Sequence, residues 1–339
     1  MTGPILIWGA GAIGGSLGAA FIRSGHEVIF VDNEPEHVEA INRTGLKIVG
    51  PIFEDTLCAS AFLPRDLAGS FDRIFLCVKA LHTDAAVQDL LPHLTEGGYV
   101  VSAQNGLNEL VIARAVGAQR TIGCFVNFGA DYLEPGVVTY SGRGAVVVGE
   151  LDGVRTDRIV ALHSLMTEFD EGAVLTENIC GYLWGKLIYG ALLFATALTN
   201  DSIVDVLDDR EARPLLTGLG QEVGRVAAAE DIKTEVFNGF DPAAFMPDAP
   251  QTVIDRSFDE MVAHNRKSAK THSGIWRDLA VRKRKTEAEA QLGPIVAAGR
   301  KHSVSTPLTE RLIAMVTEIE AGKRPLAAEN LTELARGMT

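Results

Sequence analysis

The N-terminal segment constrains the fold most, because it places a glycine-rich turn between an apolar strand and an apolar helix. Residues 5–8 are apolar and β-prone, and they end at the run Gly9-Ala10-Gly11-Ala12-Ile13-Gly14. Small and apolar residues continue at helical spacing to Ile22, and a second apolar strand, residues 28–31, ends at Asp32. This order of strand, turn, helix and strand is the context in which G-x-G-x-x-G indicates a dinucleotide-binding unit.

Each glycine of this motif has a separate predicted role. Gly9 allows the tight turn, Gly11 lets the backbone approach a pyrophosphate, and Gly14 lets the helix pack closely against the strand. Ala12 and Ile13 begin the helix, whose free N–H groups and dipole favour an anion. A glycine-rich turn without a ligand is the alternative, but the acid that closes the second strand favours a dinucleotide.

Asp32 bears on the choice between NAD and NADP. An acid near this spacing accepts hydrogen bonds from the adenosine ribose, and it repels a 2′-phosphate. The next residue is Asn33 and not an arginine. The sequence therefore favours NAD over NADP as the cofactor.

Composition restricts the class of protein. The chain has 339 residues, enough for two domains, with 47% hydrophobic residues and a net charge of −13. Such a charge disfavours nucleic acid and anionic membranes as partners. Residues 3–22 are uncharged but interrupted by glycines, and residues 187–198 are too few to span a bilayer, so we expect no membrane segment. The cysteines have no C-x-x-C pairing, which predicts reduced thiols in a cytoplasmic protein; they are Cys58, Cys77, Cys124 and Cys180.

The chain changes character near residue 177. Before it, apolar strands alternate with helical segments, which predicts a doubly wound, mostly parallel α/β sheet of the Rossmann type over residues 1–177. Residues 129–144 are read as a polar, glycine-rich connection between strands. After it, helical periodicity dominates, so residues 178–339 are predicted to form an all-helical domain for substrate binding and dimerisation. Residues 237–250 are read as a loop.

Polar residues follow two of the predicted strands. Lys79 comes after the strand of residues 71–78, and Asn105 after that of residues 99–102. Ligands of such sheets bind at the carboxyl ends of the strands, so both residues are candidates for cofactor or substrate contact. The alternatives are an exposed loop lysine and a turn-forming asparagine before Gly106.

Two residues of the second half are candidates for proton chemistry. Lys186 begins a strongly apolar helix, where it is either a lysine with its stem on apolar surface or a general acid with a lowered pKa. Glu287 is either an acid of a first helical turn, capped by Thr286, or a catalytic partner. The basic run Arg282–Lys285 is read as a solvated face. No metal-ligand cluster, catalytic triad or Walker loop is present in the sequence.

These segments together resemble the ketopantoate reductase (2-dehydropantoate 2-reductase) family. The matching stretches are GAGAIGG at Gly9, CVKA at Cys77, QNG at Gln104, WGKL around Lys186 and WRDL…KTE ending at Glu287. The resemblance implies a Rossmann domain followed by a helical domain, with a 2-oxo acid reduced by a nicotinamide between them. It implies Lys186 as proton donor, Glu287 as its partner, Lys79 and Asn105 at the nicotinamide and substrate, and a homodimer.

The sequence departs from the family at several positions. Asparagines that contact the substrate are replaced by Gly190 and Phe194, one and two turns after Lys186, and the family's serine falls at Gly274, beside Ser273, with Asp278 retained. We therefore expect Gly190, Phe194, Ser273 and Asp278 at the substrate, and a bulkier or aromatic 2-oxo acid than ketopantoate. Residues 237–250 resemble an insertion that could form a lid. Two rival functions are an NAD-preferring D-2-hydroxyacid dehydrogenase and a dinucleotide-binding protein without catalysis.

Overall fold

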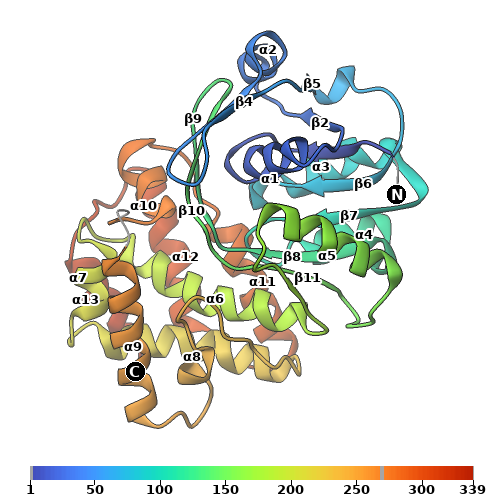
Figure 1. Cartoon of the computed structure of the whole chain (residues 1–339). Helices are drawn as coiled ribbons and strands as arrows, with labels where there is room; N and C mark the ends of the chain where they lie inside the picture. Colours follow the sequence, from blue (N-terminus) through green and yellow to red (C-terminus); the bar gives the residue numbers. More distant parts are fainter. Residues whose placement is uncertain (1–2, 268–270, 339) are drawn as a thin grey trace. The chain divides into compact units, whose positions relative to one another are not determined.

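The computed structural model describes residues 3–267 and 271–338 of the chain, which divides after Ile179 into two compact units (Figure 1). The first unit contains the β-sheets and the second is helical. The predicted order, an α/β half followed by a helical half, is confirmed.

An eight-stranded sheet forms the centre of the first unit, in the order β12-β11-β8-β7-β6-β1-β2-β5. Its pairs are parallel except for β8 and β11, which are antiparallel. The strands are β1 (Ile5–Trp8), β2 (Val28–Val31), β5 (Ser60–Phe62), β6 (Phe71–Leu76), β7 (Leu94–Ser102), β8 (Thr121–Val126), β11 (Val146–Glu150) and β12 (Val174–Leu175).

Both faces of this sheet are covered, which explains why its central strands β1 and β2 are continuously apolar. Ile5 and Ile7 of β1 point into one cluster, with α1 and α5, whereas Leu6 and Trp8 point into another, with α3 and α4. The helices are α1 (Ala12–Arg23), α2 (Pro35–Thr44), α3 (Thr83–Leu90), α4 (Glu109–Val116) and α5 (Asp157–Phe169). Short 3₁₀ turns are η1 (Pro64–Asp66), η2 (Ala80–His82), η3 (Leu91–His93) and η4 (Ala118–Arg120).

A second, four-stranded sheet was not predicted. It has the order β4-β3-β10-β9 and consists of β3 (Leu46–Val49), β4 (Asp55–Leu57), β9 (Gly129–Glu134) and β10 (Val137–Gly142). The interpretation of residues 129–144 as a polar connection is therefore wrong, since they form a hairpin whose β10 pairs in parallel with β3. Most of β9 is half-exposed, so the strand lacks the apolar pattern that would have revealed it.

The second unit is built from helices around α6 (Ile179–Thr196), which carries Lys186. Helical periodicity predicts helices over residues 182–199, 214–230, 252–268, 285–302 and 307–321. Each is found within a few residues of these bounds, and the predicted end at Ser268 lies outside the described residues. Short α7, α10 and α13 were not predicted. The remaining elements are α7 (Ile203–Asp208), α8 (Arg213–Ala229), η5 (Pro242–Phe245), α9 (Gln251–Arg266), α10 (Gly274–Trp276), the π-helical turn η6 (Arg277–Val281), α11 (Ala288–Lys301), α12 (Pro307–Glu320), α13 (Glu329–Ala335) and η7 (Arg336–Met338).

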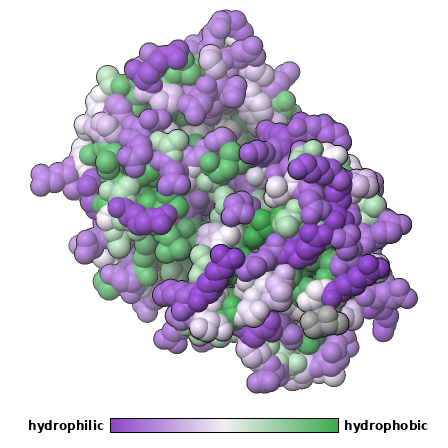
Figure 2. All heavy atoms as spheres, turned by 180° about the vertical axis from the view of Figure 1, so that it is seen from behind, coloured by the Kyte–Doolittle hydropathy of each residue, from purple (hydrophilic) through white to green (hydrophobic). Residues whose placement is uncertain are grey.

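Helix α6 is longer than the apolar segment read from the sequence. Its 18 residues have a mean hydropathy of 1.3, enough by length and composition to cross a membrane, and 67% of them are buried within the protein. Core helices of soluble proteins share these properties, and the face in Figure 2 is mostly hydrophilic, with hydrophobic side chains in smaller groups.

Aromatic side chains anchor the segment of residues 237–250 in the helical unit. Phe237 and Phe240 pair through an isolated β-bridge, and Phe245 is completely buried. A Cβ on Gly220 would lie 2.3 Å from a ring carbon of Phe245, so a glycine at this position of α8 leaves room for the ring. These aromatic side chains therefore belong to the core of the helical unit, and the expectation of a lid stays a prediction.

Candidate functional site

The glycine turn has the geometry that its sequence predicts. Gly9 has φ +100°, and a Cβ on it would lie 2.8 Å from the backbone N of Val78. A Cβ on Gly14 would lie 2.0 Å from the Gly9 carbonyl oxygen, so only glycine allows this contact of helix and turn. At Gly11, in contrast, a Cβ would meet nothing within 4 Å. The protein thus leaves open space above the turn at Gly11.

The first turn of α1 is open to an anion. Gly11 occupies its N-cap position without a side-chain cap, and the first turn contains no acid. Ala12 and Ile13 are half-buried at this helix end. N–H groups without a side-chain partner, next to open space, fit the phosphates of a dinucleotide.

Asp32 binds the turn itself. Its Oδ2 accepts from the Ala10 N–H at 2.8 Å, and its Oδ1 accepts from the Glu34 N–H at 3.1 Å. Each carboxylate oxygen has further lone pairs, so the same group can still accept from a ribose. Asp32 therefore fixes the turn as well as standing where a ribose is expected.

His37 of α2 also holds this turn, and the sequence analysis did not identify it. Its side chain is buried; Nε2 lies 3.0 Å from the Ala10 carbonyl oxygen, and the Gly136 N–H donates to Nδ1 at 2.8 Å. These partners require the neutral tautomer with the proton on Nε2. His37 thereby links the turn to the β9–β10 hairpin.

Lys79 and Asn105 follow neighbouring strands, as predicted. Backbone bonds from Cys77 N–H to the Trp8 carbonyl and from Ala103 N–H to the Leu76 carbonyl join the ends of β1, β6 and β7. Lys79 is half-buried at the start of η2, and Asn105 is exposed before Gly106, which has φ +99°. The sheet therefore brings both side chains to the edge that carries the glycine turn.

Buried polar side chains lie behind these two residues. Gln104, Thr83 and Asn108 are 4%, 1% and 5% exposed and are joined by hydrogen bonds. Glu109 follows, and neither of its carboxylate oxygens has a hydrogen-bond partner of normal geometry among the described residues. Burial raises the pKa of Glu109 to about 7, which its own backbone N–H and the Ser102 hydroxyl oppose only in part.

In the helical unit, α6 places Lys186 and Gly190 on one face. Lys186 is half-buried, and a Cβ on Gly190 would meet nothing within 4 Å. Phe194, two turns after Lys186, is completely buried. Its aromatic ring has no accessible surface for a substrate, so any effect on substrate choice passes through packing of the helix.

Glu287 stands at the N-cap position of α11, and its side chain does not cap the helix. Thr286 caps instead, since its Oγ1 accepts from the Ala288 N–H at 3.2 Å. Glu320 of α12 fixes Thr286 by accepting from its N–H at 2.8 Å and from its hydroxyl at 2.6 Å. Thr286 therefore caps the start of α11 with Glu287 beside it, which is the arrangement that the alternative to a catalytic role predicts.

Ser273 and Asp278 have structural partners. Ser273 Oγ caps α10 by accepting from the Trp276 N–H at 3.1 Å. The buried Asp278 carboxylate pairs with Arg282 Nη1 at 3.3 Å and Arg284 Nε at 2.9 Å. Residues 282–285 are all exposed, as predicted for a solvated face, and Asp278 partly neutralises them. The substrate contacts of Ser273 and Asp278 stay predictions.

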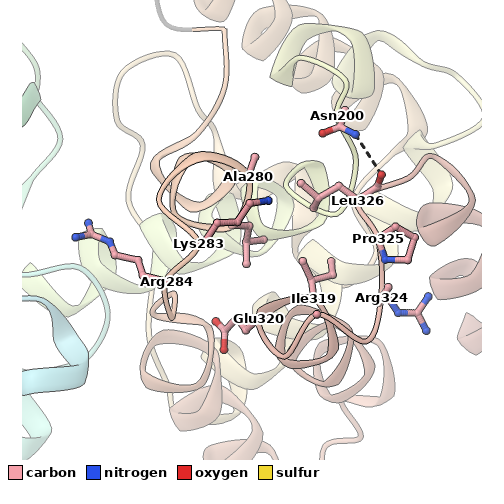
Figure 3. A pocket seen from close by; sticks show the side chains of 11 residues that line it. Asn200, Ala280, Lys283, Arg284, Ile319, Glu320, Arg324, Pro325 and Leu326 are labelled. Atoms are coloured by element: carbon pink, nitrogen blue, oxygen red, sulfur yellow. Dashed lines mark hydrogen bonds between the residues drawn. The ribbon is translucent and has the colours of Figure 1, made fainter.

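A cavity of about 460 Å³ lies within the helical unit beside this loop (Figure 3). Apolar side chains, including Ile319 and Leu326, form part of its wall. Its charged groups are largely engaged, Glu320 with Thr286, Arg284 with Asp278, and Arg324 with Glu318 and Glu333. The cavity therefore borders the loop leading to Glu287 without presenting a cluster of unpaired charges.

No group of three or more potential metal-ligating side chains gathers within the part of the chain that the structure describes.

Family profiles match both halves of the chain. The family described as Ketopantoate reductase PanE/ApbA matches residues 5–153, and that described as Ketopantoate reductase PanE/ApbA C terminal matches residues 178–320.

Two curated relatives are 2-dehydropantoate 2-reductases of archaea. The chain is 32% identical to that of Pyrococcus abyssi over 190 residues, which cover 56% of this chain and 61% of the relative. It is 27% identical to that of Archaeoglobus fulgidus over 319 residues, which cover 94% of this chain and 98% of the relative.

Solved structures share the fold. A PanE/ApbA family ketopantoate reductase from Ralstonia eutropha has a TM-score of 0.79 and 26% identity, covering 95% of this chain and 99% of its own. A D-mandelate dehydrogenase in a ternary structure with NADH and anilino(oxo)acetate has a TM-score of 0.82 and 23% identity, with the same coverage.

Proposed function

Because this chain belongs to the ketopantoate reductase family of oxidoreductases, we propose that it reduces the ketone of a 2-oxo acid with a nicotinamide cofactor. The observation that carries the proposal is the open, uncapped glycine turn at the strand edge that also holds Lys79 and Asn105. The residues present fit the cofactor, which supplies the hydride when bound.

Lys186 is the proposed general acid. As the hydride arrives at the carbonyl carbon, the C=O π bond breaks and the Lys186 ammonium gives a proton to the developing alkoxide oxygen. Glu287 orients Lys186 or pairs with it. Lys79 and Asn105 position the nicotinamide and the substrate.

The proposed cofactor is NADH. Asp32 places a carboxylate at the end of β2, where a 2′-phosphate would be repelled, and Glu34 and Glu36 follow it. NADPH is the alternative, and parallel assays of the two cofactors decide between them.

The proposed substrate is bulkier than ketopantoate. The open space at Gly190 replaces an amide-bearing side chain of the family, and it favours a second candidate on the same scaffold, an NAD-preferring D-2-hydroxyacid dehydrogenase acting on aromatic substrates. A dinucleotide-binding protein without catalysis is a third candidate, against which the retention of Lys186, Asn105 and Glu287 argues.

We also propose a cytoplasmic homodimer formed through the helical domain. Sedimentation equilibrium tests the assembly, and a monomer at micromolar concentration would contradict it.

The deciding experiment follows oxidation of NADH and NADPH with ketopantoate and with a panel of branched and aromatic 2-oxo acids. Ketopantoate turnover at kcat/KM of about 10⁴ M⁻¹s⁻¹ or more would assign the family's usual substrate. Weak ketopantoate turnover with strong NADH-linked reduction of a bulkier acid would support the proposed substrate and cofactor. Oxidation of a D-2-hydroxyacid without ketopantoate turnover would assign the second candidate. Tight NADH binding without reduction of any 2-oxo acid would leave only the binding protein.

A further inference from the structure

A chain of buried hydrogen bonds joins the two loops that carry Lys79 and Asn105. Gln104 Nε2 donates to the Val78 carbonyl at 2.8 Å and to Thr83 Oγ1 at 2.8 Å. Thr83 Oγ1 donates to Asn108 Oδ1 at 2.8 Å, and Asn108 Nδ2 donates to the Asn105 carbonyl at 2.7 Å. We call Gln104, Thr83 and Asn108 the polar bridge.

The direction of every bond in the polar bridge is fixed by its ends. The Val78 and Asn105 carbonyls only accept, so each amide must turn its NH₂ group toward its carbonyl. Thr83 then has one arrangement left, in which it accepts from Gln104 and donates to Asn108. From Gln104 to the Asn105 carbonyl the donors all point the same way, and hydrogen bonds in such a chain strengthen one another in a low-dielectric interior.

The polar bridge acts on backbone atoms next to the candidate site residues. Val78 directly precedes Lys79, and the Asn105 carbonyl belongs to the site residue itself. Gln104 belongs to the loop after β7, Thr83 is the first residue of α3, and Asn108 precedes α4. The distance between the backbones of Lys79 and Asn105 therefore depends on three buried side chains that need not touch a ligand.

Thr83 is the weakest point, because among the described residues its hydroxyl alone joins the amide of Gln104 to that of Asn108. Removing its hydroxyl leaves a Gln104 N–H and the Asn108 Oδ1 without that partner in a buried place, where unsatisfied polar groups are costly. The loops relieve this cost by moving apart or admitting water. Catalysis is sensitive to such movement, since misplacement by about 1 Å can lower rates by about 10²-fold.

We propose that Thr83, Gln104 and Asn108 are positioning residues, which set the relative placement of Lys79 and Asn105 for hydride and proton transfer. This inference rests on the proposed function, because it assigns Lys79 and Asn105 to the nicotinamide and substrate. It extends that function to side chains buried behind the site.

The test compares Thr83→Val, Thr83→Ser and the control Thr121→Val. Thr121 is also buried in the first unit, and its hydroxyl donates to the Gly117 carbonyl at 3.0 Å, at the start of β8 and so at the opposite edge of the sheet. Steady-state kinetics with the best 2-oxo acid are measured well below the unfolding temperature. Amide hydrogen exchange of residues 103–110 is measured without ligand.

We expect Thr83→Val to lower kcat by about 10-fold to 100-fold, with the KM for the cofactor unchanged within a factor of two. We expect Thr83→Ser, which keeps the hydroxyl, to have the wild-type kcat. Thr121→Val is also expected to have the wild-type kcat. Exchange of residues 103–110 rises in Thr83→Val alone. A merely structural role would lower the thermal stability of both valine variants without this difference in kcat and exchange.

Wild-type kcat in Thr83→Val, an equal loss in Thr121→Val, or no rescue by Thr83→Ser would overturn the proposal. If the wild-type protein reduces no 2-oxo acid, the proposed function fails instead. The exchange measurement then still decides whether the polar bridge holds the loop, because it needs no turnover, and unchanged exchange in Thr83→Val would refute the bridge by itself.

Discussion

Glu109 shows most clearly how a single residue links structure to pH. Its carboxyl is buried and its pKa is raised to about 7, so the folded protein favours the protonated form. An unfolded chain releases this proton near pH 4.5. The contribution of Glu109 to the free energy of unfolding is therefore most favourable below pH 4.5. It falls as the pH rises toward 7 and stays low above pH 7.

Glu109→Gln removes this dependence. We expect the variant to unfold at nearly the same temperature as the wild type at pH 5 and at a higher temperature at pH 8. The pKa difference corresponds to about 3 kcal/mol of unfolding free energy above pH 7. Thermal unfolding at the two pH values checks this, and an equal effect at both would show that Glu109 is already neutralised by other means.

Lys186→Met tests the proposed general acid. Loss of a positioned proton donor is expected to lower kcat by about 10²-fold to 10⁴-fold, while NADH still binds as in the wild type. Lys301→Met is the control, because Lys301 forms an exposed ion pair with Glu230. Stopped-flow reduction and NADH fluorescence separate the two quantities, and a wild-type kcat in Lys186→Met would remove the lysine from the mechanism.

Gly190→Asn tests the substrate assignment. Since a Cβ on Gly190 meets nothing within 4 Å, the variant is expected to fold and to gain an amide for ketopantoate. One added hydrogen bond predicts a rise in kcat/KM for ketopantoate of about tenfold. Gly190→Ala serves as control, and a rise of the same size in it would mean that the amide is irrelevant. Phe194→Asn is unsuitable as a partner change, because it would bury an amide in the core.

At the level of secondary structure, helix α2 and the β9–β10 hairpin stabilise the glycine turn, although neither belongs to it. His37 and Asp32 together bind both backbone groups of Ala10. His37→Leu leaves the Ala10 carbonyl and the Gly136 N–H without this partner. Because the turn must then become ordered when NADH binds, we expect NADH to bind about tenfold more weakly.

Fluorescence titration with NADH measures the effect of His37→Leu. The matched control is His163→Leu, because His163 Nε2 also bonds a backbone carbonyl, that of Ala173 at 2.9 Å, away from the turn. If the two variants bind NADH equally well, His37 has no part in shaping the turn.

Helices and strands could be predicted from the sequence where the local hydrophobic pattern matches the burial of the side chains. The strands β1 and β2 read as continuous apolar runs, and β6 and β8 contain such runs at residues 74–76 and 124–126, because parallel strands are covered on both faces. The hairpin of β9 and β10 was missed because its half-buried strands depend on pairing with β3, which lies far away in the sequence. The glycine turn and Lys186 could be found by motif, whereas His37 and the polar bridge act through contacts that no local pattern records.

At the scale of the whole chain, the C-terminal segment is hydrogen-bonded to the beginning of the helical unit. Asn330 is buried and donates to the carbonyls of Leu198 and Pro325, each at 2.9 Å, while its Oδ1 accepts from Arg324 at 2.8 Å. Helix α13 was not predicted, because it is too polar to show a hydrophobic pattern. One of its hydrogen bonds joins residues 132 positions apart.

Asn330→Leu is expected to destabilise the helical unit, because three partners lose a buried hydrogen bond. A cost of about 1–3 kcal/mol follows, visible as a lower midpoint in urea. Asn200→Leu is the exposed counterpart, as Asn200 donates to the Leu326 carbonyl at 3.2 Å, and it should have a smaller effect. Equal midpoints for the two variants would contradict a structural role for the buried amide.

The bond between His37 and Gly136 also has a consequence for synthesis of the protein. The glycine turn leaves the ribosome before its outer partner, which lies 99 positions after His37. At about 5–20 residues per second, the nascent chain waits about 5–20 s between the two. During that interval the turn lacks one of its supports, so the cofactor can stabilise the emerging domain through the complete turn only after the hairpin has been translated.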